Sequence, residues 1–149
     1  MIRVDGALKP PGFIASAAMF TLILKDNHLY ILRTGPGVAS QSIYTKALLD
    51  QRQSRKAIDN LATSAVAKSV MKKVKKGEEQ IDNGDPDTLA GEKGSVKVPV
   101  SDVQDVETNK RSELVIRLTF KAANKKWKLD CSTIVESELT ELVQGLKAG

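Results

Sequence analysis

Few residues in this chain are of the types that carry out catalysis, and their spacing does not form an active site. His28 is the only histidine and Cys131 the only cysteine, and no partner for acid–base or nucleophilic chemistry accompanies either of them. His28 follows Asp26-Asn27, a pair suited to a tight turn, so we expect a surface turn residue. Cys131 follows a predicted strand, and we expect a small core residue. The sequence predicts no catalytic residue and no enzyme activity.

Metal and phosphate patterns are also incomplete. The acidic run 82–87 lacks the alternate-residue oxygen ligands and the closing glutamate of an EF-hand calcium loop. Residues 91–94, Gly-Glu-Lys-Gly, lack the Gly-Lys-Ser/Thr ending of a phosphate-binding loop. One cysteine cannot form an intrachain disulfide or a cysteine-based zinc site. We therefore predict no metal, no cofactor and a reducing, cytoplasmic location.

The residues best suited to binding are basic and belong to the segment 40–76. This segment holds nine Lys and Arg residues against two Asp residues, whereas the whole chain has a formal charge of +5. On a helix over 66–76, the basic side can contact an acidic partner or lie on an anionic membrane. A helix whose basic side is only solvated, while its apolar side packs on the core, would give the same pattern. The predicted partner-binding or anion-binding residues are Lys68, Lys72, Lys73, Lys75 and Lys76.

The apolar side of the same helix predicts a second contact. Apolar residues between 43 and 65 share one helical sector, but the later ones centre on another, about 150° away. If the first sector covers a sheet, the second needs a different surface, because water rarely faces a contiguous apolar patch. We predict self-association through Val66, Val70, Met71 and Val74. A membrane face and an internal helical hairpin are the alternatives.

The helical state of 40–76 follows from its composition. It contains neither Gly nor Pro and is rich in Ala, Lys, Gln and Leu. An unbroken helix of this length would span roughly 55 Å, more than the ~30 Å of a small domain. It must project, bend or break, so one long helix and two helices both remain open. The acidic segment 77–94 contains Gly84 and Pro86 and is predicted to be a flexible loop.

Strand patterns surround this segment. The run from Phe13 to Leu24 is nearly free of polar side chains, but about a dozen residues are too few for a membrane span, which needs roughly 20. We predict a buried strand that turns at Asp26-Asn27 into a second strand. Further strands are predicted near 96–106, 114–120 and 127–129. Thr133 and Glu136 fit a capping box for a final amphipathic helix, with Leu139 and Leu142 packed on the sheet.

Two stretches carry a resemblance to a known family. The segment 20–32, Phe-Thr-Leu-Ile-Leu-Lys-Asp-Asn-His-Leu-Tyr-Ile-Leu, and the segment 98–103, Val-Pro-Val-Ser-Asp-Val, are similar to those of bacterial pleckstrin-homology-like (PH-like) domains. The resemblance implies an α+β fold, a bent antiparallel sheet capped by one C-terminal helix. Residues 1–149 would form a single domain, and 40–76 would be a helical insertion.

These observations favour a binding or assembly module without catalysis, acting in protein–protein interaction through the sheet and the helical insertion. The alternative is peripheral association with anionic membrane lipids through the helix 66–76. We expect a homo-oligomer or a protein partner. Nucleic acid is disfavoured because Trp127 and Tyr44 are not interleaved with the basic run as a stacking surface requires. A second basic group, around Lys125, is explained as a guarded hairpin edge; its other members are Lys121, Lys126 and Lys128.

Overall fold

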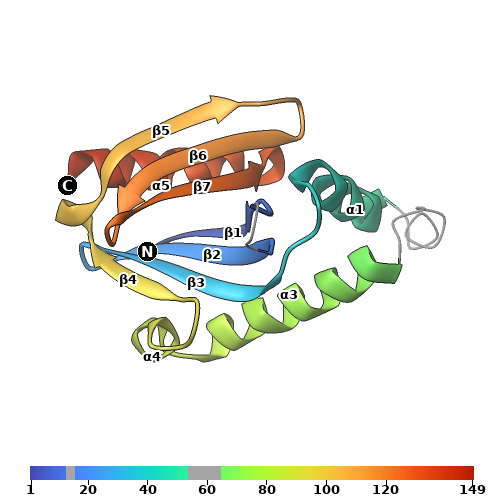
Figure 1. Ribbon diagram of the computed structural model, residues 1–149, viewed down its shortest axis with the longest axis horizontal. Helices are drawn as coiled ribbons and strands as arrows, with labels where there is room; N and C mark the ends of the chain where they lie inside the picture. Colours follow the sequence, from blue (N-terminus) through green and yellow to red (C-terminus); the bar gives the residue numbers. More distant parts are fainter. Residues whose placement is uncertain (13–15, 54–64) are drawn as a thin grey trace.

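The computed structural model describes residues 1–12, 16–53 and 65–149, and side chains outside 13–15 and 50–68. Seven strands form one antiparallel sheet in the order β4-β3-β2-β1-β7-β6-β5 (Figure 1). The α+β class predicted from the sequence is confirmed. The strands are β1 (Ile2–Lys9), β2 (Ala18–Lys25), β3 (His28–Pro36), β4 (Val96–Pro99), β5 (Gln104–Lys110), β6 (Val115–Ala122) and β7 (Lys125–Ser132). The α-helices are α1 (Gln41–Gln53), α3 (Ala65–Asn83), α4 (Pro86–Ala90) and α5 (Glu136–Ala148).

Strand β1 joins the two halves of the sheet, because it pairs with β2 on one side and with β7 on the other. The β1–β2 register shifts between Val4 and Ala7, and Gly6 between them has a φ of +70°. A bulge of this kind bends its strand and increases the local twist. A Cβ at Gly6 would lie 3.2 Å from Cε1 of Tyr44, so the bend also brings α1 close to β1.

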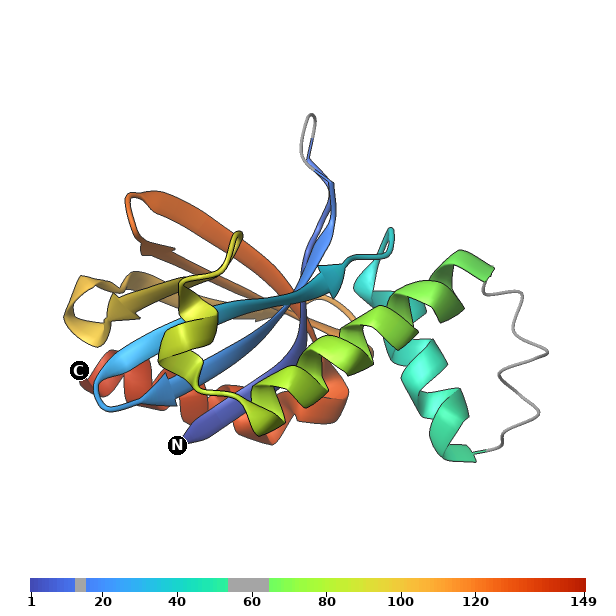
Figure 2. The ribbon, with the colours of Figure 1, turned by 90° about the horizontal axis from the view of Figure 1, so that it is seen from below.

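The main core lies on the inner side of this bend. Trp127 packs edge-on against Phe20, with ring centres 5.7 Å apart, and stacks on Phe120 at 6.1 Å. Helix α5 contributes Leu139, Leu142 and Leu146, each at most 3% exposed, to the same core. Figure 2 shows α5 along one side of the sheet, with α3 on another. The predicted burial of Leu139 and Leu142 is confirmed.

The turns agree with their sequence signals, but the start of α5 does not. Asp26 and Asn27 both have positive φ, as do Ala123 and Asn124, the geometry of two-residue hairpins. The capping box predicted at Thr133 is wrong. The Ser132 side chain instead accepts a hydrogen bond from the Ile134 amide at 3.2 Å. The Thr133 hydroxyl donates to the Glu113 carbonyl at 2.7 Å, so it ties the approach to α5 to the connection between β5 and β6.

The helical segment occupies the outer face of the sheet. Its described parts are two separate helices, α1 and α3, that both lie against the sheet near its bend (Figure 2). The alternative of two helices is therefore the one found, and the connection 54–64 lies outside the described residues. Gln41, only 1% exposed, donates from Nε2 to the carbonyls of Gly6 and Asp130 at 2.6 and 2.7 Å. One side chain thus links α1 to both halves of the sheet.

The prediction of a flexible acidic loop over 77–94 is wrong for most of its length. Helix α3 continues to Asn83, and α4 follows after a short break. Asp85 caps α4 by accepting from the Asp87 amide at 3.3 Å. Asp87 then accepts from the Tyr30 hydroxyl at 2.9 Å and from Lys97 Nζ at 2.6 Å. The acidic residues are ordered because they serve as caps and as partners of the sheet.

Gly77 permits a close approach between the backbones of α3 and β3, and substituting it tests this packing. A Cβ at Gly77 would lie 2.8 Å from the Thr34 Cα and closer still to the Thr34 carbonyl oxygen. On an isolated helix, Gly→Ala stabilises by roughly 1 kcal/mol. Here we expect Gly77→Ala to destabilise by about 1–3 kcal/mol, because backbone atoms cannot move aside as a side chain can.

Urea denaturation of Gly77→Ala beside Gly91→Ala measures this effect. The nearest atom to a Cβ at Gly91 is the Thr88 carbonyl oxygen at 3.4 Å, an ordinary contact. A Gly77→Ala variant at least as stable as the wild type would show that α3 does not approach β3 so closely.

Candidate functional site

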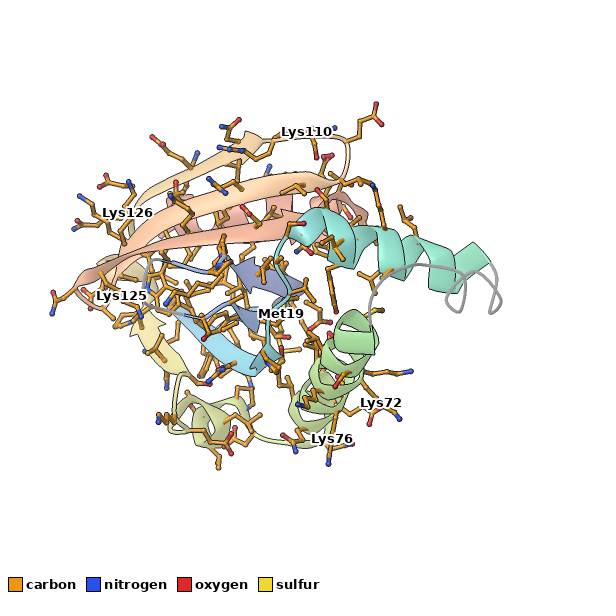
Figure 3. All side chains as sticks on the ribbon, turned by 45° about the vertical axis from the view of Figure 1, so that its right-hand side comes forward. Met19, Lys72, Lys76, Lys110, Lys125 and Lys126 are labelled. Carbon is orange, nitrogen blue, oxygen red and sulfur yellow. The ribbon has the colours of Figure 1, made fainter. Side chains whose placement is uncertain are left out.

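The apolar side of α3 packs on the chain's own sheet. Val70 is 6% exposed and Val74 is fully buried, in a cluster that also holds Met19. The other members of the cluster are Leu8, Val38 and Tyr44, and Met71 is partly buried against it. Figure 3 shows Met19 between the strands and α3.

This packing corrects the predicted self-association stripe. Val70 and Val74 offer no surface to a second copy, because strands β1 and β2 and helix α1 already cover them. Met71 is partly covered in the same way, and the side chain of Val66 lies outside the described residues. The internal arrangement, with the helical segment folded back on its own domain, is the alternative that the structure contains.

The basic side of α3 faces away from the sheet. We call Lys72, Lys73, Lys75 and Lys76 the α3 lysine face; all four side chains are exposed. Figure 3 shows Lys72 and Lys76 pointing outward from α3. Ion pairs found within the described part of the chain include none of the four. The side chain of Lys68, the fifth predicted residue, is outside that part.

A polar network fixes the second half of α3 on β1. Arg3 Nε donates to Asp5 at 3.0 Å, Nη1 pairs with Asp82, and Nη2 donates to the Glu78 carbonyl at 3.2 Å. Asp5 also accepts from the Thr21 hydroxyl at 2.7 Å. Arg3 therefore connects β1 to two successive turns of α3. Together with the valines and Gly77, it holds the α3 lysine face in a fixed orientation.

Little in the sequence predicts this network. Arg3 and Asp5 lie in β1, which was missed as a strand because the bulge at Gly6 interrupts the alternation of its side chains. Glu78 and Asp82 belonged to the segment predicted as a loop. The sequence contains one signal: every residue from Met19 to Leu24 except Thr21 is apolar. It indicates a strand covered on both faces, so a second covering element had to exist.

A second basic group surrounds the β6–β7 turn, as expected from the sequence. Lys121, Lys125 and Lys126 line a hollow of about 600 Å³ there. Lys125 Nζ lies 4.1 Å from the centre of the Trp127 ring. Burial, and then the charge of nearby Lys9, lower the pKa of Lys125. Trp127 is 3% exposed and fills the core, so its ring cannot stack on a base. Figure 3 shows Lys125 and Lys126 well apart from Lys72 and Lys76.

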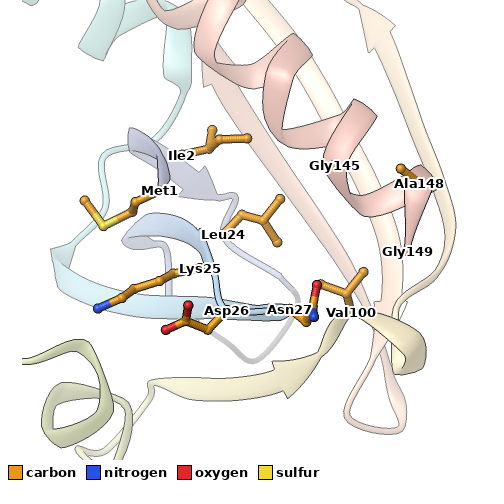
Figure 4. A pocket seen from close by; sticks show the side chains of 10 residues that line it. All are labelled: Met1, Ile2, Leu24, Lys25, Asp26, Asn27, Val100, Gly145, Ala148 and Gly149. Atoms are coloured by element: carbon orange, nitrogen blue, oxygen red, sulfur yellow. The ribbon is translucent and has the colours of Figure 1, made fainter.

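Another hollow, of about 540 Å³, lies between the β2–β3 turn and the last turn of α5 (Figure 4). Lys25, Asp26 and Asn27 supply its polar side chains, and Leu24 and Val100 are among its apolar ones. Gly145 in this lining allows α5 to pack closely, because a Cβ there would meet the Leu24 side chain. The hollow brings together no acid–base pair or nucleophile.

The two residues with catalytic potential lie in separate strands. His28 begins β3, and its Nδ1 is 2.7 Å from the Asp26 carbonyl oxygen within the turn. Cys131 is in β7 with no exposed surface, and burial followed by the charge of Asp130 raises its thiol pKa to about 12. Because the thiolate is the nucleophilic form, this cysteine is unreactive near neutral pH. The core position expected for Cys131 is confirmed, whereas His28, expected in the turn, is the first residue of β3 beside it and is half-buried.

Within the part of the chain that the structure describes, no group of three or more His, Cys, Asp and Glu side chains is placed to hold a metal ion. None of the helices in the described ranges is long and apolar enough to cross a membrane.

Comparison of the sequence with protein-family models and with curated proteins found no match. The architecture is therefore the basis for classification. A bent antiparallel sheet of seven strands with a C-terminal helix is compatible with a PH-like fold. The helical segment between β3 and β4 carries the α3 lysine face on its exposed side.

Proposed function

We propose that this chain is a cytoplasmic PH-like domain of the bacterial kind that acts as a non-catalytic binding module, with the α3 lysine face as its contact surface for an acidic protein partner. The observation that carries the proposal is the division of α3 into a buried apolar side and an exposed basic side. Four lysines within five positions are held outward by a helix that is fixed to the sheet. A fixed row of like charges attracts an acidic surface and steers its approach.

The second candidate is peripheral association with anionic lipids through the same lysines. A helix that lies in a membrane buries its apolar face among the lipids. The apolar side of α3 is occupied by the sheet, so this helix can offer a membrane only its charges. An anionic membrane would therefore attract α3 only through charge, which is the weaker part of the interaction. For this reason we favour a protein partner over a lipid surface.

Charge reversal tests the proposal. We expect the wild type to bind poly-L-glutamate at low ionic strength, and the quadruple variant Lys72→Glu, Lys73→Glu, Lys75→Glu and Lys76→Glu to bind at least about tenfold more weakly. Fluorescence anisotropy with labelled poly-L-glutamate measures the affinity. A matched variant with the same change of charge on exposed lysines elsewhere should lose much less; its substitutions are Lys25→Glu, Lys93→Glu, Lys110→Glu and Lys147→Glu.

Three outcomes would distinguish the α3 lysine face from net charge, from the β6–β7 turn and from a lipid surface as the basis of binding. Equal losses in the two variants would show that only net charge matters, which contradicts a defined contact surface. Loss with Lys125→Glu and Lys126→Glu, but not with the α3 variant, would move the site to the β6–β7 turn. Equal or tighter binding to vesicles of phosphatidylglycerol and phosphatidylcholine than to poly-L-glutamate, abolished by the α3 variant, would make the lipid surface the partner.

A further inference from the structure

The contact between α3 and β1 gathers three acidic residues, Asp5, Glu78 and Asp82, around Arg3, whose guanidinium binds the carboxylates of only two of them. Arg3 donates to Asp5 and pairs with Asp82, and its remaining contact here is the backbone carbonyl of Glu78, not the side chain. Within the described residues, no hydrogen bond to the Glu78 carboxylate is found. Arg3 therefore neutralises Asp5 and Asp82 in part, and among the described side chains no cation pairs directly with the Glu78 carboxylate.

The surroundings of Glu78 disfavour its negative charge. Strand β1 presents Asp5 and the engaged Arg3, α1 presents the Tyr44 side chain, and α3 itself presents Asp82 and Lys75. Lys75 is exposed, so water screens its charge, whereas Glu78 is half-buried in the contact. Burial first, and then the charge of Asp5, raise the pKa of Glu78 from 4.5 to about 7. Burial, together with the charges of Glu78 and Asp5, also raises the pKa of Tyr44, so the phenol stays neutral.

We propose that the Glu78 carboxylate takes up a proton when α3 packs on the sheet, so that α3 is held most firmly at acid pH and loosens as the pH rises through neutrality. The direction follows from linkage: the folded chain binds this proton more tightly than the unfolded chain does. The contribution is fully present below the ordinary glutamate pKa and is lost between about pH 4.5 and 7. This inference does not depend on the identity of any partner.

Loosening of α3 would uncover a specific surface. Its last turns place Ile81 over Ile23, Tyr30 and Leu32 on the outer face of β2 and β3. Its first turns place Val70 and Val74 over Met19. The proton at Glu78 thus controls how firmly the insertion covers the outer apolar face of the sheet, and with it how rigidly the lysines are presented.

The direct test is the titration of the Glu78 carboxyl carbon by NMR in the wild-type protein. We expect its midpoint to lie at least one pH unit above that of Glu79, its exposed neighbour. Asp5→Asn should lower the Glu78 midpoint, because it removes the facing carboxylate. A Glu78 midpoint equal to that of Glu79 would overturn the proposal, whatever the stability of any variant.

Stability provides the second readout. Between pH 5.5 and 8.0 the folding equilibrium constant of the wild type should fall by about tenfold more than that of Glu78→Gln. The partial exposure of Glu78 is the reason for expecting less than the full effect of its pKa shift. Glu79→Gln should keep the wild-type dependence. Identical pH dependence in the wild type and Glu78→Gln would contradict the proposal.

Discussion

Val70→Glu is expected to give a destabilised monomer. Val70 is 6% exposed and contacts the cluster between α3 and the sheet. A carboxylate at this position must either lose its hydration or force α3 off the sheet, and we expect a loss of about 3 kcal/mol or more in the free energy of unfolding. Urea denaturation gives this value, and sedimentation equilibrium gives the mass.

Ser69→Glu is the matched control, because Ser69 is the exposed neighbour of Val70 on the same helix. It adds the same charge and should leave the denaturation midpoint nearly unchanged. If the wild type sedimented as a dimer and Val70→Glu as a stable monomer, α3 would be an intermolecular contact after all.

The other large effect is expected at α5. Leu142 is fully buried among the core residues of both halves of the sheet. Leu142→Ala removes apolar contacts and leaves a cavity, so it should cost about 2–5 kcal/mol. Urea denaturation beside Gln144→Ala, an exposed position on the same helix, separates the cavity from any change in helix propensity. An unchanged midpoint in Leu142→Ala would contradict the packing of α5 on the sheet.

Much of the fold could be predicted from local patterns. The alternation at 114–120, the turn at Asp26-Asn27 and the helical spacing of Leu139 and Leu142 all correspond to elements of the structure. These signals are local, because a strand face or a tight turn depends on residues close together in the sequence. They were sufficient for the α+β class.

The contacts of the helical segment 40–76 could not be predicted in the same way. The spacing of Val70 and Val74 is the same for a dimer, a membrane or the chain's own sheet. What selects the sheet is the shape of β3 near Thr34 and Gly35, where α3 approaches through Gly77 and Val74. The composition of 77–94 suggested a mobile loop, because the contacts that hold the segment, with Arg3, Tyr30 and Lys97, come from residues outside it.

Chemical footprinting of the lysines tests the central claim most directly. Amines are acetylated in the wild-type protein with and without poly-L-glutamate, and the modification of each lysine is measured by mass spectrometry. The α3 lysine face is predicted to be protected, with Lys72, Lys73, Lys75 and Lys76 modified several-fold more slowly in the presence of the acidic polymer, while Lys110 and Lys126 are unaffected. Protection confined to Lys125 and Lys126, or spread evenly over all exposed lysines, would contradict the assignment of α3 as the binding surface.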